Sequence, residues 1–263
     1  MGCAGRVANG VNTVCCCYAT PVAHALVGAR VWVPAGQLDD ADRRAALGIG
    51  DEVSFRTRPE LAIDIGTDMV TDQTIPSWCA GDEVYGRSAA LRTFCEENKV
   101  GYVLRVGCAF HLELAPGTRG RADALVRRFT GSARSWQRCS VAGSKGERAY
   151  AWAWLATTSP HHHLLIRRHL ATGEFAYHYC FVPPGRTVTL ISLVRVACLR
   201  WPVEETLCAT KRAAVSPVQP GGTRREVSGS DGLPGAERLR GQEHARKPTA
   251  RSRRLGWRVG GPA

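Results

Sequence analysis

The sequence of 263 residues lacks several patterns that would place it in a common class. None of its 11 cysteines forms a Cys-x-x-Cys pair, which argues against a zinc finger or zinc ribbon. No apolar run reaches the roughly 18–20 residues that a membrane span requires, and the best candidate, between Val11 and Val33, contains proline, histidine and arginine. We therefore expect a soluble cytoplasmic protein with no membrane partner, in which reduced cysteines act as small hydrophobic side chains.

Positive charge is in excess. The formal net charge is +12, which indicates a polyanionic partner such as nucleic acid. Most of this charge lies between Leu207 and Ala263, where 12 Lys and Arg residues face 4 Asp and Glu residues. The same segment is rich in Gly and Pro and has no apolar periodicity. We therefore expect residues 207–263 to be a disordered basic tail.

Residues 1–206 carry the patterns of regular structure and predict a single α/β domain. Strands alternate with amphipathic helices in its first half, which is typical of helices packed on the faces of a sheet. The first two strands are continuous apolar runs and are expected inside the sheet. Residues 110–189 predict a β-rich section before a last helix. The predicted elements are strands at Val11–Ala19, His24–Val33, Ser77–Val84 and Gly101–Gly107, and helices at Pro59–Val70, Ser88–Asn98 and Leu190–Glu205.

Asp82 is the first candidate functional residue. It stands at the end of the predicted strand Ser77–Val84, and ligands of open α/β sheets bind at the carboxyl ends of strands. Its neighbour Glu83 would point to the opposite face if the strand continued. The structural alternative is that Asp82 only caps the helix predicted at Ser88–Asn98.

A second acidic position lies in the predicted last helix. Arg200, Glu204 and Lys211 are four and seven residues apart, so a continuous helix would align all three. Glu204 could then bind a metal ion, and the two basic residues could hold phosphates. Pro202 removes one backbone hydrogen bond from that helix, which would kink or begin there, and the alternative is a surface helix with ordinary ion pairs.

Several segments together resemble insertion-sequence transposases of the DDE class. These segments are GVNTV…YATP, HALVGARVWVP, PELAID, WCAGDEVYG, AGSKGERAYAWAWLATTSP, HHLLIRRHLATGEFAYHYCFVP and LVRVACLRWPVEE. The resemblance extends over about residues 2–205. It implies a ribonuclease-H-like catalytic domain, a mixed sheet with flanking helices, with a β-rich insertion before the last helix.

The resemblance also implies a site and its chemistry. Two Mg²⁺ ions, held by three acids, would promote cleavage and transfer of DNA strands at the transposon ends and the target. Asp82 and Glu204 match two of these acids, and four basic residues are expected on the DNA: Arg200, Lys211, Lys145 and Arg148. A homodimer or a full-length transposase is a further expected partner, and the expected location is cytoplasmic, associated with the nucleoid.

The sequence departs from the family at both ends. The first catalytic Asp of the family lies on a central strand, in an Asp-x-Thr-Gly-like motif that is absent from this chain, so that strand and the third metal ligand are expected to be missing. After Glu205 the family's acidic and aromatic helix is replaced by the basic tail. We therefore expect a truncated remnant, frame-shifted or fused near residue 206, with weak metal binding and no activity.

Two other interpretations stay open at this stage. The chain could be a basic DNA-binding fragment without catalysis that interferes with a full-length transposase. It could instead hold a metal through a histidine-rich section, although adjacent histidines on a strand alternate between its faces. The residues of that section are His161, His162, His163, His169, His178 and Cys180.

Overall fold

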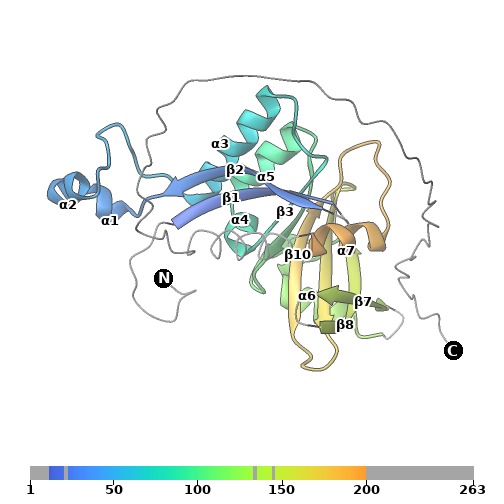
Figure 1. Cartoon of the computed structure of the whole chain (residues 1–263). Coiled ribbons are helices and arrows are strands. Elements are labelled where there is room, and N and C mark those ends of the chain that lie inside the picture. Colours follow the sequence, from blue (N-terminus) through green and yellow to red (C-terminus); the bar gives the residue numbers. More distant parts are fainter. Residues whose placement is uncertain (1–11, 21–22, 133–134, 144–145, 200–263) are drawn as a thin grey trace, which may run out of the picture.

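The computed structural model of the chain describes residues 12–20, 23–132, 135–143 and 146–199, without the side chains of residues 140–148. Figure 1 shows the order of the elements along the chain. The strands are β1 (Asn12–Ala19), β2 (His24–Trp32), β3 (Trp78–Gly81), β4 (Gly101–Val106), β5 (His111–Glu113), β6 (Arg119–Arg121), β7 (Gln137–Gly143), β8 (Gly146–Ala156), β9 (His162–His169) and β10 (Phe175–Phe181). The helices are α1 (Ala35–Leu38), α2 (Ala41–Ala46), α3 (Arg58–Thr71), α4 (Glu83–Gly86), α5 (Ala89–Glu97), α6 (Ala122–Phe129) and α7 (Leu190–Cys198).

A six-stranded mixed sheet forms the centre of the domain. Its strand order is β3-β4-β10-β9-β8-β7. β3 and β4 are parallel, with Trp78 opposite Gly101, and the other neighbours are antiparallel. Together with the flanking helices, this sheet confirms the predicted α/β fold class and is compatible with a ribonuclease-H-like fold.

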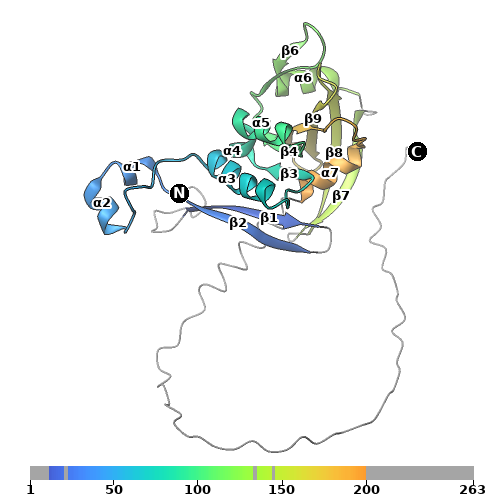
Figure 2. The ribbon, with the colours of Figure 1, turned by 90° about the horizontal axis from the view of Figure 1, so that it is seen from above.

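The domain has three layers, because the sheet has helices on both of its faces. The alternation of side chains along β4 explains this arrangement. Tyr102 and Leu104 are fully buried on one face and pack against Leu91 of α5. Val103 points to the other face, where it meets Leu193 of α7. Because successive residues of a strand face opposite sides, one apolar strand supports a helix on each face of the sheet. Figure 2 shows β4 between these two helices.

The helices begin where side chains can satisfy their first backbone N–H groups. Thr57 and Glu60 form a reciprocal capping box at the start of α3. The Ser88 hydroxyl accepts a hydrogen bond from the Leu91 N–H at the start of α5, and Thr189 caps α7 in the same way. These caps confirm the beginnings of the three helices that the sequence predicts.

The prediction that the first two strands are interior strands is wrong for the part of the chain that the structure describes. β1 and β2 pair only with each other and form a separate two-stranded sheet. The hairpin lies along α3, where Val14 packs against Leu61 and Ile65 (Figure 2). Most of its other side chains are half-buried or exposed, because one helix covers one face only.

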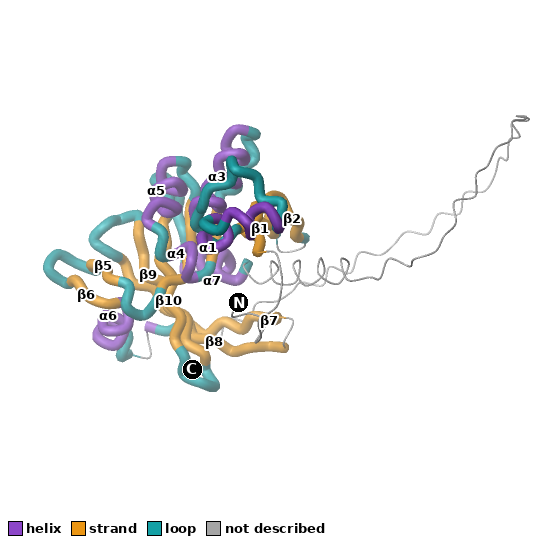
Figure 3. The backbone as a smooth tube through the Cα atoms, turned by 90° about the vertical axis from the view of Figure 1, so that its left-hand side faces the viewer, coloured by secondary structure: helices purple, strands orange, loops and turns teal. Residues whose placement is uncertain are grey.

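The section at residues 110–189 is rich in strands, as predicted, and four of them, β7 to β10, continue the main sheet. β10 pairs with β4 on one side and with β9 on the other, so this section extends the sheet that begins with β3. It also contains α6, which the sequence reading did not predict. Figure 3 shows α6 beside β5 and β6, and its Leu125 and Val126 pack under Leu112 of β5.

The end of the last predicted helix lies outside the described residues. α7 accounts for Leu190–Cys198, and Leu199 is its C-cap. The predicted continuation to Glu205 and the tail at residues 207–263 are not among the residues that the structure describes. Within the described residues, no helix combines the length and the apolar character needed to cross a membrane.

Candidate functional site

Asp82 directly follows β3. The strand ends at Gly81, earlier than predicted, because Asp82 and Glu83 begin the short helix α4. β3 runs parallel to β4, with Gly81 opposite Leu104, so Asp82 lies at the carboxyl end of the only parallel pair among the described strands. This is the edge at which the sequence predicts a ligand site.

The carboxylate of Asp82 has a local structural partner. Its Oδ1 accepts a hydrogen bond of 2.9 Å from the backbone N–H of Val84, and this makes Asp82 the N-cap of α4. The alternative reading placed Asp82 at the cap of the next helix, but Ser88 takes that role. Among the described residues no hydrogen bond reaches the second carboxylate oxygen, so that oxygen can accept a further ligand.

Close backbone packing fixes the position of α4. A Cβ atom placed on Gly86 would lie 1.9 Å from the carbonyl oxygen of Arg105 on β4. Only glycine permits this approach, which holds the short helix against the sheet. The guanidinium of Arg92 donates a hydrogen bond to the carbonyl of Gly86 and so satisfies the end of α4. The cap at Asp82 is therefore attached to a well-packed element.

The carboxylate of Glu83 does not lie with that of Asp82. A Cβ atom placed on Gly107 would lie 2.8 Å from Oε1 of Glu83, so this carboxylate lies over the residue that follows β4. Glu83 is also not among the residues that line the cavity beside Asp82. The two neighbouring acids therefore face different surroundings.

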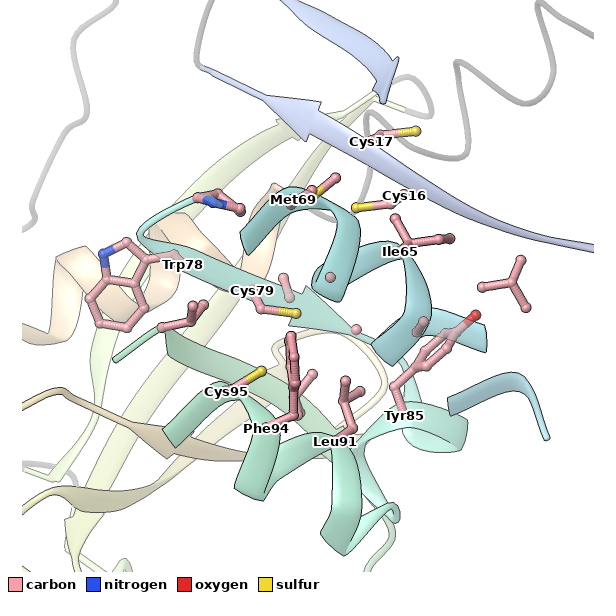
Figure 4. Close-up of a pocket in the computed structure, with 18 of the residues that line it drawn as sticks. Cys16, Cys17, Ile65, Met69, Trp78, Cys79, Tyr85, Leu91, Phe94 and Cys95 are labelled. Carbon is pink, nitrogen blue, oxygen red and sulfur yellow. The ribbon is translucent and has the colours of Figure 1, made fainter. Parts of the chain in front are cut away.

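A cavity of about 350 Å³ extends from Asp82 between β1 and β3. Residues 13–17 of β1 form one wall, and residues 78–81 of β3 with the following Asp82 form another. α3 and α5 supply further lining side chains, among them Ile65, Met69, Leu91 and Phe94 (Figure 4). The cavity is thus mainly apolar, and Asp82 is one of its lining residues.

Burial disfavours the charged forms of two ionisable side chains in this cavity. Burial raises the pKa of Tyr85 to about 12, and the nearby Asp82 carboxylate adds to this shift. Burial also raises the pKa of Cys16 to about 11, with smaller contributions from Cys79 and its neighbours in β1. Desolvation disfavours the charged form of each group. Among the described residues that line the cavity, Asp82 is the single residue of the Asp, Glu, Lys and Arg types.

Two of the lining cysteines are partners. Cys79 of β3 and Cys95 of α5 are neighbours in the lining, and Figure 4 shows their sulfur atoms directed toward each other. This contact and burial raise the pKa of Cys95. Both side chains pack among the apolar groups of the lining, and the redox state of the cysteines stays a prediction.

Most of the other predicted site residues lie outside the described part of the chain. These are Arg200, Glu204, Lys211 and Lys145. Arg148 is in β8, where it pairs with Val141, but its side chain is not described. Of these predicted catalytic and DNA-binding residues, Asp82 is therefore the one whose side chain the structure describes, and the convergence of Asp82 and Glu204 stays a prediction.

The histidine-rich section has local structural roles. His162 contacts the Ser159 hydroxyl through Nδ1 at 2.8 Å and Oε1 of Glu96 through Nε2 at 3.2 Å. Nδ1 of His169 accepts backbone N–H groups in the turn after β9. Burial lowers the pKa of His163, which packs on Trp154. In the described part of the chain, no three His, Cys, Asp or Glu side chains are grouped to hold a metal ion.

The described residues do not make a complete divalent-metal site. Mg²⁺ and similar ions are held by several oxygen ligands, and Asp82 supplies one free carboxylate oxygen at this edge. Tyr85 is a neighbour that the sequence reading missed: it stands three residues after Asp82 and lines the same cavity. Its phenol is protonated and near Asp82, so it contributes a polar group but no second charge.

Comparisons with known proteins identify the family. A family model described as DDE superfamily endonuclease matches residues 1–160. Neither the curated proteins nor the solved structures gave a match. The matched range contains Asp82, Lys145 and Arg148 and ends before α7. Because it covers more than half of the sequence, and because Asp82 stands at the expected edge of the sheet, the chain belongs to the DDE superfamily endonucleases.

Proposed function

We propose that this chain is an insertion-sequence transposase of the DDE class whose substrate is the phosphodiester backbone of transposon ends and target DNA. The observation that carries the proposal is the family match over residues 1–160, with Asp82 at the carboxyl end of β3 inside it. Endonucleases of this superfamily act on DNA and use divalent metal ions. The excess of positive charge agrees with a DNA substrate.

In this proposal Asp82 and Glu204 are metal ligands, and Mg²⁺ is the ion. Two bound ions would offset negative charge on the attacking and leaving oxygens of the phosphodiester. The cap hydrogen bond from Val84 orients the Asp82 carboxylate and leaves its second oxygen for a ligand. Arg200, Lys211, Lys145 and Arg148 would hold the DNA backbone without reading its sequence.

We further propose that the chain by itself does not cleave DNA. Among the described residues, Asp82 is the single acid that lines the cavity, and Glu83 is directed elsewhere. A paired-metal site needs several carboxylates close together, so even with Glu204 in place it would lack a ligand. DNA binding should not depend on these acids.

A nicking assay tests this part of the proposal. Supercoiled plasmid is incubated with the purified full-length chain in Mg²⁺ or Mn²⁺, in parallel with Asp82→Asn and with Asp72→Asn, an exposed aspartate at the end of α3 that serves as the matched control. We expect no nicking above background from any of the three. Metal-dependent nicking that Asp82→Asn abolishes and Asp72→Asn retains would show an active enzyme.

A non-catalytic DNA-binding role is the second candidate, and the net charge of +12 favours it. Such a protein could occupy DNA or pair with a full-length transposase and so interfere with transposition. Binding to a duplex of roughly 30 base pairs should weaken steeply between about 50 and 200 mM salt, because bound basic groups release counterions. Affinity that is unchanged in Asp82→Asn supports this role. Binding without salt dependence would contradict both candidates.

A further inference from the structure

We infer that the chain binds an unpaired segment of its DNA substrate on an exposed surface of arginine and phenylalanine side chains, at the edge of the sheet that carries Asp82. The inference rests on the proposed function, since it takes DNA as the substrate, and it adds the form of the DNA and the residues that hold it. We call this the Arg–Phe surface, and its members are Arg127, Arg128, Phe129, Arg138, Arg168 and Phe175, all of them exposed.

Strand register brings half of the Arg–Phe surface together. Phe175 of β10 is opposite Arg168 of β9. In β8, Ala151 is opposite Arg168 on one side and Arg138 of β7 on the other. Residues directly opposite each other in antiparallel strands share a face of the sheet. The small Ala151 therefore lies between two arginines, in a row that ends at Phe175.

Helix α6 supplies the other half. It covers the same face further along the strands, where its side chains pack with Ile166 and Tyr177. Trp136 connects the end of the helix to the row. Its Nε1 donates a hydrogen bond of 2.9 Å to the carbonyl of Thr130, and its ring centroid lies 5.8 Å from that of Phe175. The last turn of α6, which carries the other three members, therefore adjoins the row.

The rings and their neighbours suit unpaired nucleotides. Phe129 and Phe175 remain 42% and 37% exposed. Each ring has a guanidinium beside it: Arg128 lies 5.2 Å from the ring centroid of Phe129, and Arg168 lies 5.9 Å from that of Phe175. An exposed ring can stack on a base, and a guanidinium next to it can hold the phosphate of the same nucleotide.

Among the described residues, three of the four arginines of the Arg–Phe surface form no ion pair with an acid. The fourth, Arg127, lies 3.9 Å from Asp123, but Arg121 is closer to that carboxylate, at 3.0 Å. The surface is therefore positively charged, and phosphate groups complement it. The three arginines without an acidic partner are Arg128, Arg138 and Arg168.

The Arg–Phe surface and Asp82 belong to the same edge of the sheet. β10 is antiparallel to β4, so Phe175 at its beginning lies toward the carboxyl end of β4. Asp82 follows β3, which is parallel to β4. β10 and β7 are two and five strands away from β3, which corresponds to about 10 and 24 Å across the sheet. A DNA strand that reaches Asp82 can therefore continue onto this surface.

The phenylalanines favour unpaired over paired DNA. In a duplex the faces of the bases are covered by their neighbours, whereas in a single strand each base can stack on an aromatic side chain. The arginines bind phosphates, which both forms present. We therefore expect the arginines to contribute to the binding of any DNA, and the phenylalanines to contribute only where bases are unpaired.

Fluorescence anisotropy with the full-length chain tests the role of the rings. The probes are labelled oligothymidylate of about 12 nucleotides, an abasic strand of the same length and a blunt duplex. We expect Phe175→Leu to weaken binding of oligothymidylate by about fivefold or more, and binding of the other two probes by less than about twofold. Phe55→Leu changes an exposed ring outside the surface and is the matched control.

Arg168→Gln tests the role of the charges. It should weaken the binding of all three probes, and it should reduce the slope of log Kd against log salt by about 0.7 on the single strand, because one phosphate contact is lost. Arg195→Gln is the matched control, since Arg195 is exposed on α7, which packs on the opposite face of the sheet. An unchanged slope in Arg168→Gln, or an equal change in Arg195→Gln, would overturn the phosphate contact.

Photocrosslinking of the native chain needs no variant. A single strand that contains 5-iododeoxyuridine should form crosslinks at Phe129 or Phe175, as located by mass spectrometry of the peptides. Crosslinks at neither ring would overturn the inference, as would an equal effect of Phe175→Leu on the abasic strand and on oligothymidylate.

The same measurements separate this inference from the proposed function. If the native chain binds the duplex with the expected salt dependence, but Phe175→Leu and Arg168→Gln bind oligothymidylate as the native chain does, the inference fails and the proposed function stands. If the native chain binds none of the three probes, both fail.

Discussion

The carboxylate of Asp82 and the backbone N–H of Val84 are joined by a hydrogen bond of 2.9 Å, which makes the candidate metal ligand also the N-cap of α4. The same side chain thus caps α4 and is the proposed metal ligand. α4 has four residues and is held to the sheet at Gly86, so loss of its cap affects the same edge that would hold a ligand. Substitutions at Asp82 must be chosen to separate the two roles.

Asp82→Ala and Asp82→Asn should differ in stability. Asparagine keeps an oxygen that can accept the Val84 N–H, whereas alanine removes the acceptor. We expect Asp82→Ala to lower the free energy of unfolding by about 1 kcal/mol and Asp82→Asn to leave it nearly unchanged. Urea unfolding followed by circular dichroism measures both. Equal losses in the two variants would show that the cap hydrogen bond does not account for the effect.

Gly86→Ala should destabilise the domain. The new methyl group would lie 1.9 Å from the carbonyl oxygen of Arg105, so α4 must move away from β4. Overpacking of this kind costs about 1–3 kcal/mol in the free energy of unfolding. Gly131→Ala is the matched control, because no atom of the residues that the structure describes lies within 4 Å of its added Cβ. A loss at Gly131 as large as that at Gly86 would contradict the steric explanation.

Alkaline pH should unfold the protein partly through Tyr85. Its pKa is raised from 10.0 to about 12 in the folded state, so between these pH values the folded state holds a proton that the unfolded state has lost. The stabilisation is therefore complete below pH 10 and is lost as the pH rises toward 12. Tyr85→Phe has no proton to lose and should show a shallower decline of stability over this range.

Chemical denaturation of the native chain and of Tyr85→Phe at a series of pH values measures the difference. Tyr18→Phe provides the control, because its side chain is exposed. Curves of the same slope for the native chain and Tyr85→Phe would show that the phenol at position 85 does not contribute to the alkaline transition.

Glu96 and His162 should be energetically coupled. Oε1 of Glu96 lies 3.2 Å from Nε2 of His162 and also accepts a hydrogen bond from the Tyr102 hydroxyl at 2.8 Å. This contact joins α5 to β9, which lie far apart in the sequence. A double-mutant cycle of Glu96→Gln and His162→Gln should give a coupling energy of about 0.5–1 kcal/mol in unfolding experiments. Additive effects would indicate that the two side chains contribute independently.

Much of the fold could be predicted from local patterns. The starts of α3, α5 and α7 follow from Thr57, Ser88 and Thr189, whose side chains satisfy neighbouring N–H groups. The apolar run at residues 101–106 gave β4, because alternating burial on both faces needs continuous hydrophobic residues. Interactions of this kind are set by residues close in sequence.

The candidate site could be predicted in part. The sequence pattern predicts Asp82 at the end of a strand, and the residues matched by the family model include Asp82. Its capping of α4 was missed, because the pattern Ser77–Val84 gave no sign that the strand would stop at Gly81. The expectation for Glu83 depended on the strand continuing, and a helical turn takes its place, yet the Glu83 carboxylate still lies apart from that of Asp82.

The sequence by itself determined the family, the placement of Asp82 at a strand end and the starts of the main helices, because these depend on motifs and on neighbours along the chain. The tertiary structure decided that β1 and β2 form their own sheet, that Gly86 touches the Arg105 carbonyl, and that an apolar cavity separates β1 from β3. These features depend on contacts between segments distant in sequence. Hydrophobic patterns show which faces must be buried, but the pairing of strand edges and the space left between them follow only from how the whole chain packs.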